Sequence, residues 1–273
     1  MHDYSVTFAT LNCLDYTRKC VESLMAAGCN PNQIVAVDNG STDDSPNYLT
    51  HNPHVGNVVL NKQNLSCGAA WNQGILAKQS EWTIVMNNDL VVSDQFAERL
   101  IDTAIANNLK MISPALIDGE LDYDFAAFDA QASQTMGDAL RLFSSHAVCM
   151  CIHWSVFMQI GFFRVNPNLL GFEDALFFHE IRKHGIRHGT TGRVWLHHFG
   201  SVTQEHMKLE RGIPQKNVLV KVNDRQLLNQ SWLERKLIRY HLKKAQRTWR
   251  EQELRQYGMT LHGVRSNHEF NWL

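Results

Sequence analysis

The feature that most constrains the fold is the alternation of short apolar runs with amphipathic segments over residues 1–115. The apolar runs predict strands at residues 6–9, 34–37, 58–60, 83–86 and 111–112. The segments between them predict helices at residues 15–27, 68–78 and 94–107, with Gly28 as a C-terminal stop and Ser93 as an N-cap. Strands that alternate with helices indicate β-α-β units on a mostly parallel sheet.

Length and charge narrow the class of protein. With 273 residues, 44% of them hydrophobic, the chain can bury one full core and carry a modest extension. The net charge of -1 gives no overall attraction to nucleic acid or membranes. The six cysteines form no CxxC pair, which favours free thiols in a reducing compartment. No apolar run approaches the roughly 18 residues of a membrane span and no signal peptide is recognisable, so we expect a cytoplasmic protein.

Two polar clusters follow predicted strands, where open α/β sheets bind ligands. Asp38 begins the sequence DNGSTDD, and it would suit a hydrogen bond from the imide N–H of a nucleotide base or would simply close a turn. Asn88 and Asp89 follow the run WTIVMN. Their oxygens would suit a divalent cation that also binds phosphate and water, or an Asx turn. Both alternatives stay open for each cluster.

Two later pairs also carry chemistry. Glu173 and Asp174 stand beside an apolar stretch at the start of a helix predicted at residues 174–184. Burial would raise the proton affinity of such a carboxylate and suit a general base, whereas the alternative is a helix cap and a salt bridge. His197 and His198 follow a strand predicted at residues 193–196. Either could be a metal or phosphate ligand or a packed histidine.

Two segments differ in character from the rest. Residues 118–145 are acidic, small and irregular, and predict a substrate-facing loop. From residue 225 a helical tail is expected, because Ile238, Leu242, Ala245 and Trp249 recur at helical spacing. Its second face is basic and contains Lys236, Lys243, Arg247 and Arg250. That face would either be solvated or contact a polyanion or the anionic surface of a membrane, as a peripheral protein does.

Six segments in a fixed order carry a resemblance to a known family. They are SVTFATLNCLDYTRKCVESL, VAVDNGSTDDS, NKQNLSCGAAWNQGI, TIVMNNDLVV, GFEDALFFHEIRKHG and WLHHFGSVT. Together they resemble the inverting family 2 glycosyltransferases, and within them the rhamnosyltransferase-like branch, over residues 5–205. The resemblance implies the glycosyltransferase A fold, a Rossmann-like α/β architecture with a mostly parallel sheet flanked by helices. We therefore expect a catalytic domain at residues 1–224 and a helical C-terminal extension at 225–273.

The resemblance also implies roles for individual residues. Those expected at the nucleotide-sugar donor are Thr10, Asn12, Asp38, Asp43, Asn64 and Asn88. Asp89, with one of His197 and His198, would bind Mn²⁺ or Mg²⁺. Asp174 would be the catalytic base and Glu173 its neighbour. Many family members have a second acidic residue where Leu176 stands and an Arg near Glu180, so the contacts to the acceptor and donor sugar are not carried over.

The implied function is metal-dependent transfer of a sugar from a UDP- or dTDP-linked donor to a hydroxyl acceptor, with inversion. Two alternatives remain. A nucleotidyltransferase would use similar carboxylate-bound Mg²⁺, but it usually has a glycine-rich, basic phosphate loop near the first strand, which SVTFATLNCLDY lacks. A non-catalytic nucleotide-sugar-binding module would bind donor without transferring or hydrolysing it.

Overall fold

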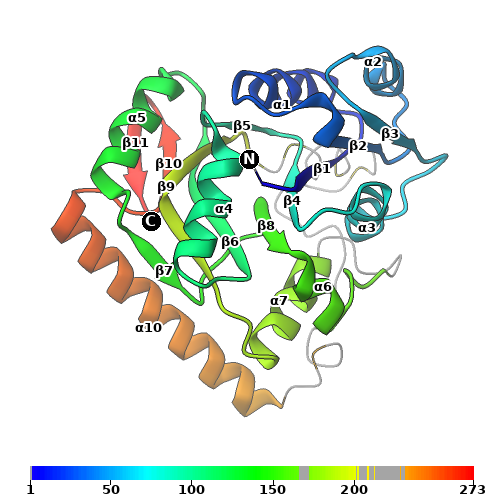
Figure 1. Ribbon diagram of the computed structural model, residues 1–273. Coiled ribbons are helices and arrows are strands. Elements are labelled where there is room, and N and C mark those ends of the chain that lie inside the picture. The colour runs from blue at the N-terminus through cyan, green and yellow to red at the C-terminus, as the bar shows by residue number, and fades with distance from the viewer. Residues whose placement is uncertain are drawn as a thin grey trace.

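The computed structural model describes residues 2–165, 172–200 and 231–273, together with Val202, Lys208, Gly212 and Leu228. Within these ranges one mixed sheet runs through the molecule, with helices on both faces (Figure 1). The strands are β1 (Tyr4–Thr10), β2 (Ile34–Asp38), β3 (Asn57–Leu60), β4 (Trp82–Asn87), β5 (Leu90–Val92), β6 (Met111–Gly119), β7 (Leu140–Leu142), β8 (Cys149–His153), β9 (His188–His198), β10 (His262–Ser266) and β11 (Glu269–Trp272). The helices are α1 (Leu14–Ala26), the short 3-10 helix η1 (Pro31–Gln33), α2 (Ser45–His51), α3 (Cys67–Ala77), α4 (Phe96–Ala106), α5 (Phe125–Met136), α6 (Trp154–Ile160), α7 (Glu173–Lys183) and α10 (Trp232–Tyr257).

The sheet has the strand order β11-β10-β6-β8-β4-β1-β2-β3, and β9 pairs with β5, β6 and β7. The five strands predicted near the N-terminus, β1 to β4 and β6, all run in one direction. Strands β5, β7, β8 and β11 run the opposite way. The predicted α/β class is therefore confirmed, and the antiparallel strands make the sheet mixed.

Apolar side chains from both faces of the sheet form the core. Helices α1, α2 and α4 pack against one face through residues such as Leu24, Leu49 and Leu100. Helices α3, α6 and α7 pack against the other face, where Phe163 and Phe177 stack with ring centroids 4.3 Å apart. This packing brings the N-terminus of α7 next to that of α3. It thereby positions the carboxylates at the start of α7.

The predicted helices are present with small shifts of their ends. Gly28 has a φ of 79° and follows the last turn of α1, so its role as a C-terminal stop is confirmed. The predicted N-cap at Ser93 is wrong, because α4 begins at Phe96 and Gln95 occupies the cap position with a φ of 49°. Ser93 is buried ahead of that turn, beside β5.

The loop predicted over residues 118–145 is wrong. Strand β6 continues to Gly119, and α5 and β7 follow it. Asp124 caps α5 by accepting a hydrogen bond from the Ala127 amide at 3.0 Å. Phe125 and Met136 are buried on the face of α5 that packs on the sheet. Because many polar residues lie between these apolar positions, the composition of the segment did not indicate an amphipathic helix.

The C-terminal segment contains the expected helix, α10, but it is not helical throughout. Strand β10 pairs in parallel with β6, and β11 completes an antiparallel hairpin with β10. Figure 1 shows α10 on the outside of the molecule, with the hairpin returning beside α5. The extension therefore adds two strands to the main sheet. The expected domain boundary at residues 224 and 225 lies outside the described residues.

The apolar stripe of α10 was expected to pack against the rest of the protein, and it does so only in part. Ala245 and Trp249 are half-buried, and Trp249 lies under the guanidinium of Arg141, whereas Ile238 and Leu242 are exposed. In the part of the chain that the structure describes, no helix is both long enough and apolar enough to cross a membrane.

Candidate functional site

Asp38, the last residue of β2, is almost fully buried. Its Oδ1 accepts hydrogen bonds from the amides of Gly40 at 3.1 Å and Ser41 at 2.9 Å. Gly40 has a φ of 89°, and a Cβ there would lie 2.6 Å from the Cα of Gln63, so the turn requires glycine. Oδ2 has no hydrogen-bond partner among the described residues. The turn thus holds the carboxylate rigidly and leaves one buried acceptor available.

Asn12 and Asp43 hold neighbouring loops together. Asn12 has a φ of 50°, and its Oδ1 accepts a hydrogen bond from the Thr42 amide at 2.6 Å. Asp43 accepts from the amides of Leu14 at 3.2 Å and Ser45 at 3.0 Å. These bonds join the loop after β1 to the loop after β2. Both residues therefore lie beside the Asp38 turn.

Asn64 lies on the other side of the same turn. Its Oδ1 accepts hydrogen bonds from Asn39 Nδ2 at 3.0 Å and from the Ser66 amide at 2.9 Å. Ser66 in turn caps α3 by accepting from the Ala69 amide. Asn64 therefore connects the residue after Asp38 with the N-terminus of α3.

Thr10 and Asn88 form a buried polar cluster with Thr17. The hydroxyl oxygens of Thr10 and Thr17 are 2.8 Å apart. Asn88 Nδ2 donates to Thr10 at 3.1 Å and to Thr17 at 2.9 Å. The cluster ties β1 and α1 to the turn between β4 and β5. It fixes the backbone that carries Asp89.

Asp89 and His198 face each other at the ends of β4 and β9. Asp89 Oδ1 and His198 Nε2 are 3.3 Å apart and pair with each other when the imidazole is protonated, and neither atom has another polar partner among the described residues. Asp89 Oδ2 accepts from the Val202 amide at 3.3 Å. Both side chains are buried, so a carboxylate oxygen and an imidazole nitrogen that bind nothing else among the described residues lie side by side.

Asp118, at the end of β6, lies behind His198. Its Oδ1 is 2.6 Å from His198 Nδ1, and its Oδ2 is 2.7 Å from His262 Nε2. Burial alone would raise the pKa of Asp118, but the hydrogen bonds from the two histidines hold it well below its usual value. For His198, burial lowers the pKa, but the hydrogen bonds to Asp118 and Asp89 and the charges of these two carboxylates outweigh it and raise the pKa to about 9.

His197 points away from this group. Neighbouring residues of a strand project to opposite faces, and the His197 ring contacts the Tyr123 hydroxyl at 3.0 Å within an aromatic cluster. Burial lowers its pKa to about 4. Of the two candidate histidines, the geometry brings only His198 to Asp89.

Glu173 and Asp174 begin α7. Glu173 is almost fully buried, and a Cβ on Gly68 would come within 2.9 Å of its Cγ, so the close approach of α3 requires glycine. Burial raises the pKa of Asp174, the hydrogen bond from the Ala175 amide opposes that shift, and the charge of Glu173 adds to it. A proton is therefore held more tightly at Asp174 than at an ordinary aspartate.

Cys67 joins the two halves of the site. Burial, and then the charges of Glu173, Asp174 and Asp89, raise the pKa of its thiol well above the usual value. One residue therefore lies within electrostatic range of all three carboxylates. The start of α7, which carries Glu173 and Asp174, and the end of β4, which precedes Asp89, both lie near the N-terminus of α3.

The sequence reasoning missed Asp118, His262 and Cys67. Asp118 carries the same signal as Asp38, an Asp directly after an apolar strand, but it lay in the segment interpreted as a loop. Cys67 is one of the six cysteines, and no motif in the sequence sets it apart from the others. The sequence around His262 does not indicate a role in the site, because only the pairing of β10 with β6 brings His262 to Asp118.

Comparisons with known proteins identify the family of this chain. The family model of glycosyl transferase family 2 matches residues 5–159, from β1 into α6. The putative glycosyltransferase EpsH of Bacillus subtilis is 29% identical over 102 residues, which make up 37% of this chain and 30% of EpsH.

Two solved structures are similar in fold. GalNAc-T7, solved with UDP, GalNAc and Mn²⁺, has a TM-score of 0.57 at 13% identity, over 72% of this chain and 44% of that protein. The mannosyltransferase PcManGT of Pyrobaculum calidifontis, in complex with GDP-Man and Mn²⁺, has a TM-score of 0.56 at 13% identity, over 77% of this chain and 61% of that protein.

The chain thus spans less than two thirds of the length of each of these three proteins. The likeness to the solved structures establishes the fold, which is the expected glycosyltransferase A fold. The family model matches more than half of the chain, and its match ends before α7. On that match, the chain belongs to glycosyl transferase family 2.

Proposed function

We propose that this chain transfers a sugar from a nucleotide-diphosphate sugar to a hydroxyl acceptor, with a divalent cation and with inversion of the anomeric carbon. The observation that carries the proposal is the buried pair of potential ligand atoms, Asp89 Oδ1 and His198 Nε2, which are 3.3 Å apart and bind nothing else among the described residues. Two solved proteins of similar fold, GalNAc-T7 and PcManGT, contain Mn²⁺ together with UDP or GDP-Man.

The residues present fit a divalent cation. A carboxylate oxygen and an imidazole nitrogen suit Mn²⁺, and carboxylate and water suit Mg²⁺. Asp89 and His198 would supply two ligands, since no cluster of three or more Asp, Glu, His or Cys with ligating geometry occurs among the described residues. Donor diphosphate and water would complete the shell. A bound cation would offset the charge that develops on the leaving diphosphate.

The Asp38 turn is the proposed site for the nucleotide base. Its Oδ2 is a buried acceptor with no partner among the described residues, and an imide N–H of uracil or thymine is a donor that fits it. This supports a UDP- or dTDP-linked donor. Asn12, Asp43 and Asn64 would form the walls of the pocket, as their loop contacts indicate. Thr10 and Asn88 would support the pocket from the buried cluster behind it.

Asp174 is the proposed base. Its raised pKa suits a group that takes a proton from a hydroxyl during the reaction. The acceptor oxygen would form a bond to the anomeric carbon as the bond from that carbon to the diphosphate oxygen breaks. The hydroxyl proton would pass to Asp174, and the diphosphate would leave with the bonding electrons. Glu173, buried behind Asp174 against α3, would keep it in place.

Thermal shift tests the metal and the donor. UDP or dTDP should raise the melting temperature with Mn²⁺ present but not with chelator, because free energy of binding adds to stability. Asp89→Asn should abolish most of this rise, while Asp94→Asn, a change at a nearby exposed carboxylate, should not. Equal shifts with and without chelator would reject the metal assignment.

Kinetics test the base. Asp174→Asn should bind donor normally while transfer falls by at least about a hundredfold, the scale of general-base catalysis. Glu173→Gln should lose less. The anomeric configuration of the product, read by NMR, tests inversion. Donor binding without transfer or hydrolysis in the wild-type protein would indicate a non-catalytic binding module instead.

A further inference from the structure

A chain of polar contacts runs from the C-terminal hairpin to the Asp89–His198 pair. His262 Nε2 is 2.7 Å from Asp118 Oδ2, and Asp118 Oδ1 is 2.6 Å from His198 Nδ1. His198 Nε2 then faces Asp89 Oδ1 at 3.3 Å. Each oxygen of the Asp118 carboxylate is thus used by one imidazole, which restrains the carboxylate in both position and rotation.

His262 reaches this chain of contacts from outside the part of the sequence that matches the family. The family match ends at residue 159, and His262 is the first residue of β10. Strand β10 aligns His262 with Leu116 and Val264 with Asp118 on β6. The parallel pairing therefore places the imidazole beside the end of β6, where Asp118 lies.

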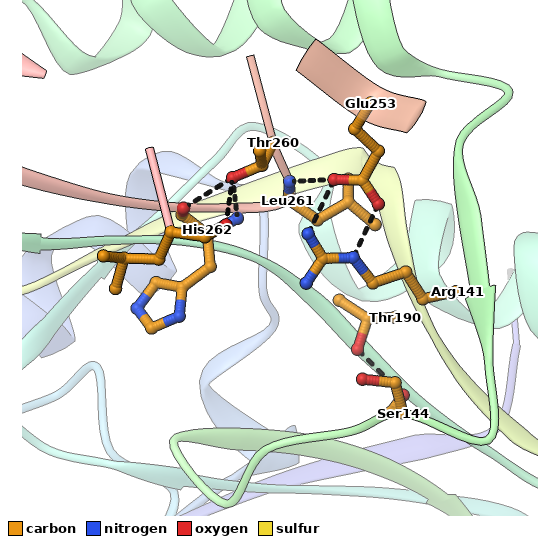
Figure 2. A network of polar contacts seen from close by, with 8 residues as sticks. Arg141, Ser144, Thr190, Glu253, Thr260, Leu261 and His262 are labelled. Atoms are coloured by element: carbon orange, nitrogen blue, oxygen red, sulfur yellow. Dashed lines mark hydrogen bonds and ion pairs between the residues drawn. The ribbon is translucent and has the colours of Figure 1, made fainter. Parts of the chain in front are cut away.

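Other contacts fix the backbone on which His262 stands. Glu253, near the end of α10, accepts from the Leu261 amide at 2.9 Å and forms two bonds of 2.6 Å with Arg141 (Figure 2). Thr260 Oγ1 donates to the His262 carbonyl at 2.7 Å. Figure 2 shows the His262 ring pointing away from Arg141 and Glu253, so the ring is not part of this anchor.

The hairpin is also held further along, independently of the His262 ring. Arg265 Nε is 2.6 Å from Asp122 Oδ1, and the guanidinium lies over the rings of Tyr123 and Phe270. The Leu273 amide donates to the His262 carbonyl at 2.9 Å. A change confined to the ring should therefore leave the hairpin in place.

We propose that His262 is a positioning residue for the metal site, and this rests on the proposed function. It donates from Nε2 to Asp118 and holds that carboxylate where it accepts from His198 Nδ1. When a cation displaces the Nε2 proton of His198, the hydrogen bond to Asp118 keeps the remaining proton on Nδ1 and leaves the Nε2 lone pair for a cation that Asp89 also binds. The C-terminal hairpin thus supplies part of the support that a metal-binding histidine requires.

The test is the affinity for Mn²⁺, measured from the EPR signal of the free ion with UDP present, beside a thermal melt of each variant. Two variants of His262 differ by a single methylene. Gln can place its amide nitrogen where Nε2 stands, whereas Asn is too short. His262→Asn should raise the Kd for Mn²⁺ by at least about threefold and Asp118→Asn by about ten- to a hundredfold, the range for groups that orient a metal ligand.

His262→Gln should stay within about twofold of wild type, since its donor is kept. His268→Asn is the control, because His268 lies on the same hairpin and contacts Asp122 rather than Asp118. If His262 acts through Asp118, then adding His262→Asn to Asp118→Asn should weaken Mn²⁺ binding no further. His262→Phe replaces the Asn variant if the latter does not fold.

The outcomes separate the two proposals. Loss with Asn, retention with Gln and no extra loss in the double variant would support the role of His262. Wild-type affinity in His262→Asn, equal loss in Asn and Gln, or additive loss in the double variant would overturn it while leaving the metal assignment intact. A wild-type protein that binds no Mn²⁺ would overturn the metal assignment and, with it, this inference.

Discussion

The ion pair between Arg141 and Glu253 should be a main anchor of the C-terminal segment. Glu253 on α10 is 7% exposed and makes two bonds of 2.6 Å to Arg141 on β7. Its Oε2 also accepts from the Leu261 amide at 2.9 Å. The perturbation is Glu253→Ala, which leaves a buried guanidinium and a buried amide without an acceptor.

The expected cost follows from this burial. Removing one partner of a buried pair costs about 3–5 kcal/mol, and an orphaned amide about 1–3, with overlap between the two effects. We take about 4 kcal/mol for Glu253→Ala. Unfolding entropy for a chain of 273 residues is about 0.6 kcal/mol/K, so the melting temperature should fall by about 7 °C. Glu253→Gln keeps an acceptor for Leu261 and should lose less.

The same helix offers a matched control. Glu251 is paired with Arg247 at 2.7 Å, nearly the distance of the buried pair, but both side chains are more than half exposed. Solvent screens such a pair, so Glu251→Ala should leave the melting temperature almost unchanged. Thermal unfolding of both variants, followed by circular dichroism in the same buffer, is the assay. Equal shifts for Glu251→Ala and Glu253→Ala would refute the reasoning, because burial is the main difference between the pairs.

Three further predictions concern separate parts of the molecule. Burial, assisted by a nearby positive charge, lowers the pKa of His188 to about 4, so the folded protein binds this proton less readily than the unfolded chain. Stability should fall by up to about 3 kcal/mol as the pH falls from about 6.5 to about 4, and His188→Phe should flatten a plot of melting temperature against pH over that window. Gly74→Ala should destabilise by about 1–3 kcal/mol in urea unfolding despite the better helix propensity of Ala, because the new Cβ would collide with the Thr7 hydroxyl and lie 2.9 Å from its Cβ. Changing exposed Lys236 and Lys243 to Gln should leave transfer to a soluble acceptor unchanged, and a loss seen only with membrane-bound acceptors would show that α10 docks there.

The sequence predicted those elements whose signal is local. Strands β1 to β4 correspond to short apolar runs, and the predicted ends of α1, α3 and α7 all lie within one residue of the observed ends. Strand β9 was predicted at four residues and has eleven. Gly189 and Gly192 interrupt its pattern, although Gly192 is needed because a Cβ there would lie 2.8 Å from the Cβ of Met136. That reason lies in a contact with α5 and is invisible in the sequence around it.

Some residues of the candidate site could likewise be predicted from local sequence, and others could not. Asp38 and Asp89 were predictable because each follows an apolar strand, and the structure places both, buried, at strand ends. The choice between His197 and His198 was not, since it depends on which of the two side chains projects to the face of the sheet where Asp89 and Asp118 lie. The contact between His262 and Asp118 joins residues 144 positions apart, a separation that no local pattern reports.

The pairing of β10 with β6 also has a consequence for the order in which the chain folds. On the ribosome, the edge of β6 is complete long before residues 262–272 exist, because synthesis proceeds at about 5–20 residues per second. During that interval an unpaired strand edge is open to other chains, which is a known route to aggregation. Closing so large a loop is also slow compared with forming the local β-α-β units. A released chain that lacks β10 and β11 should therefore be a stronger client for chaperones than the same chain with the hairpin.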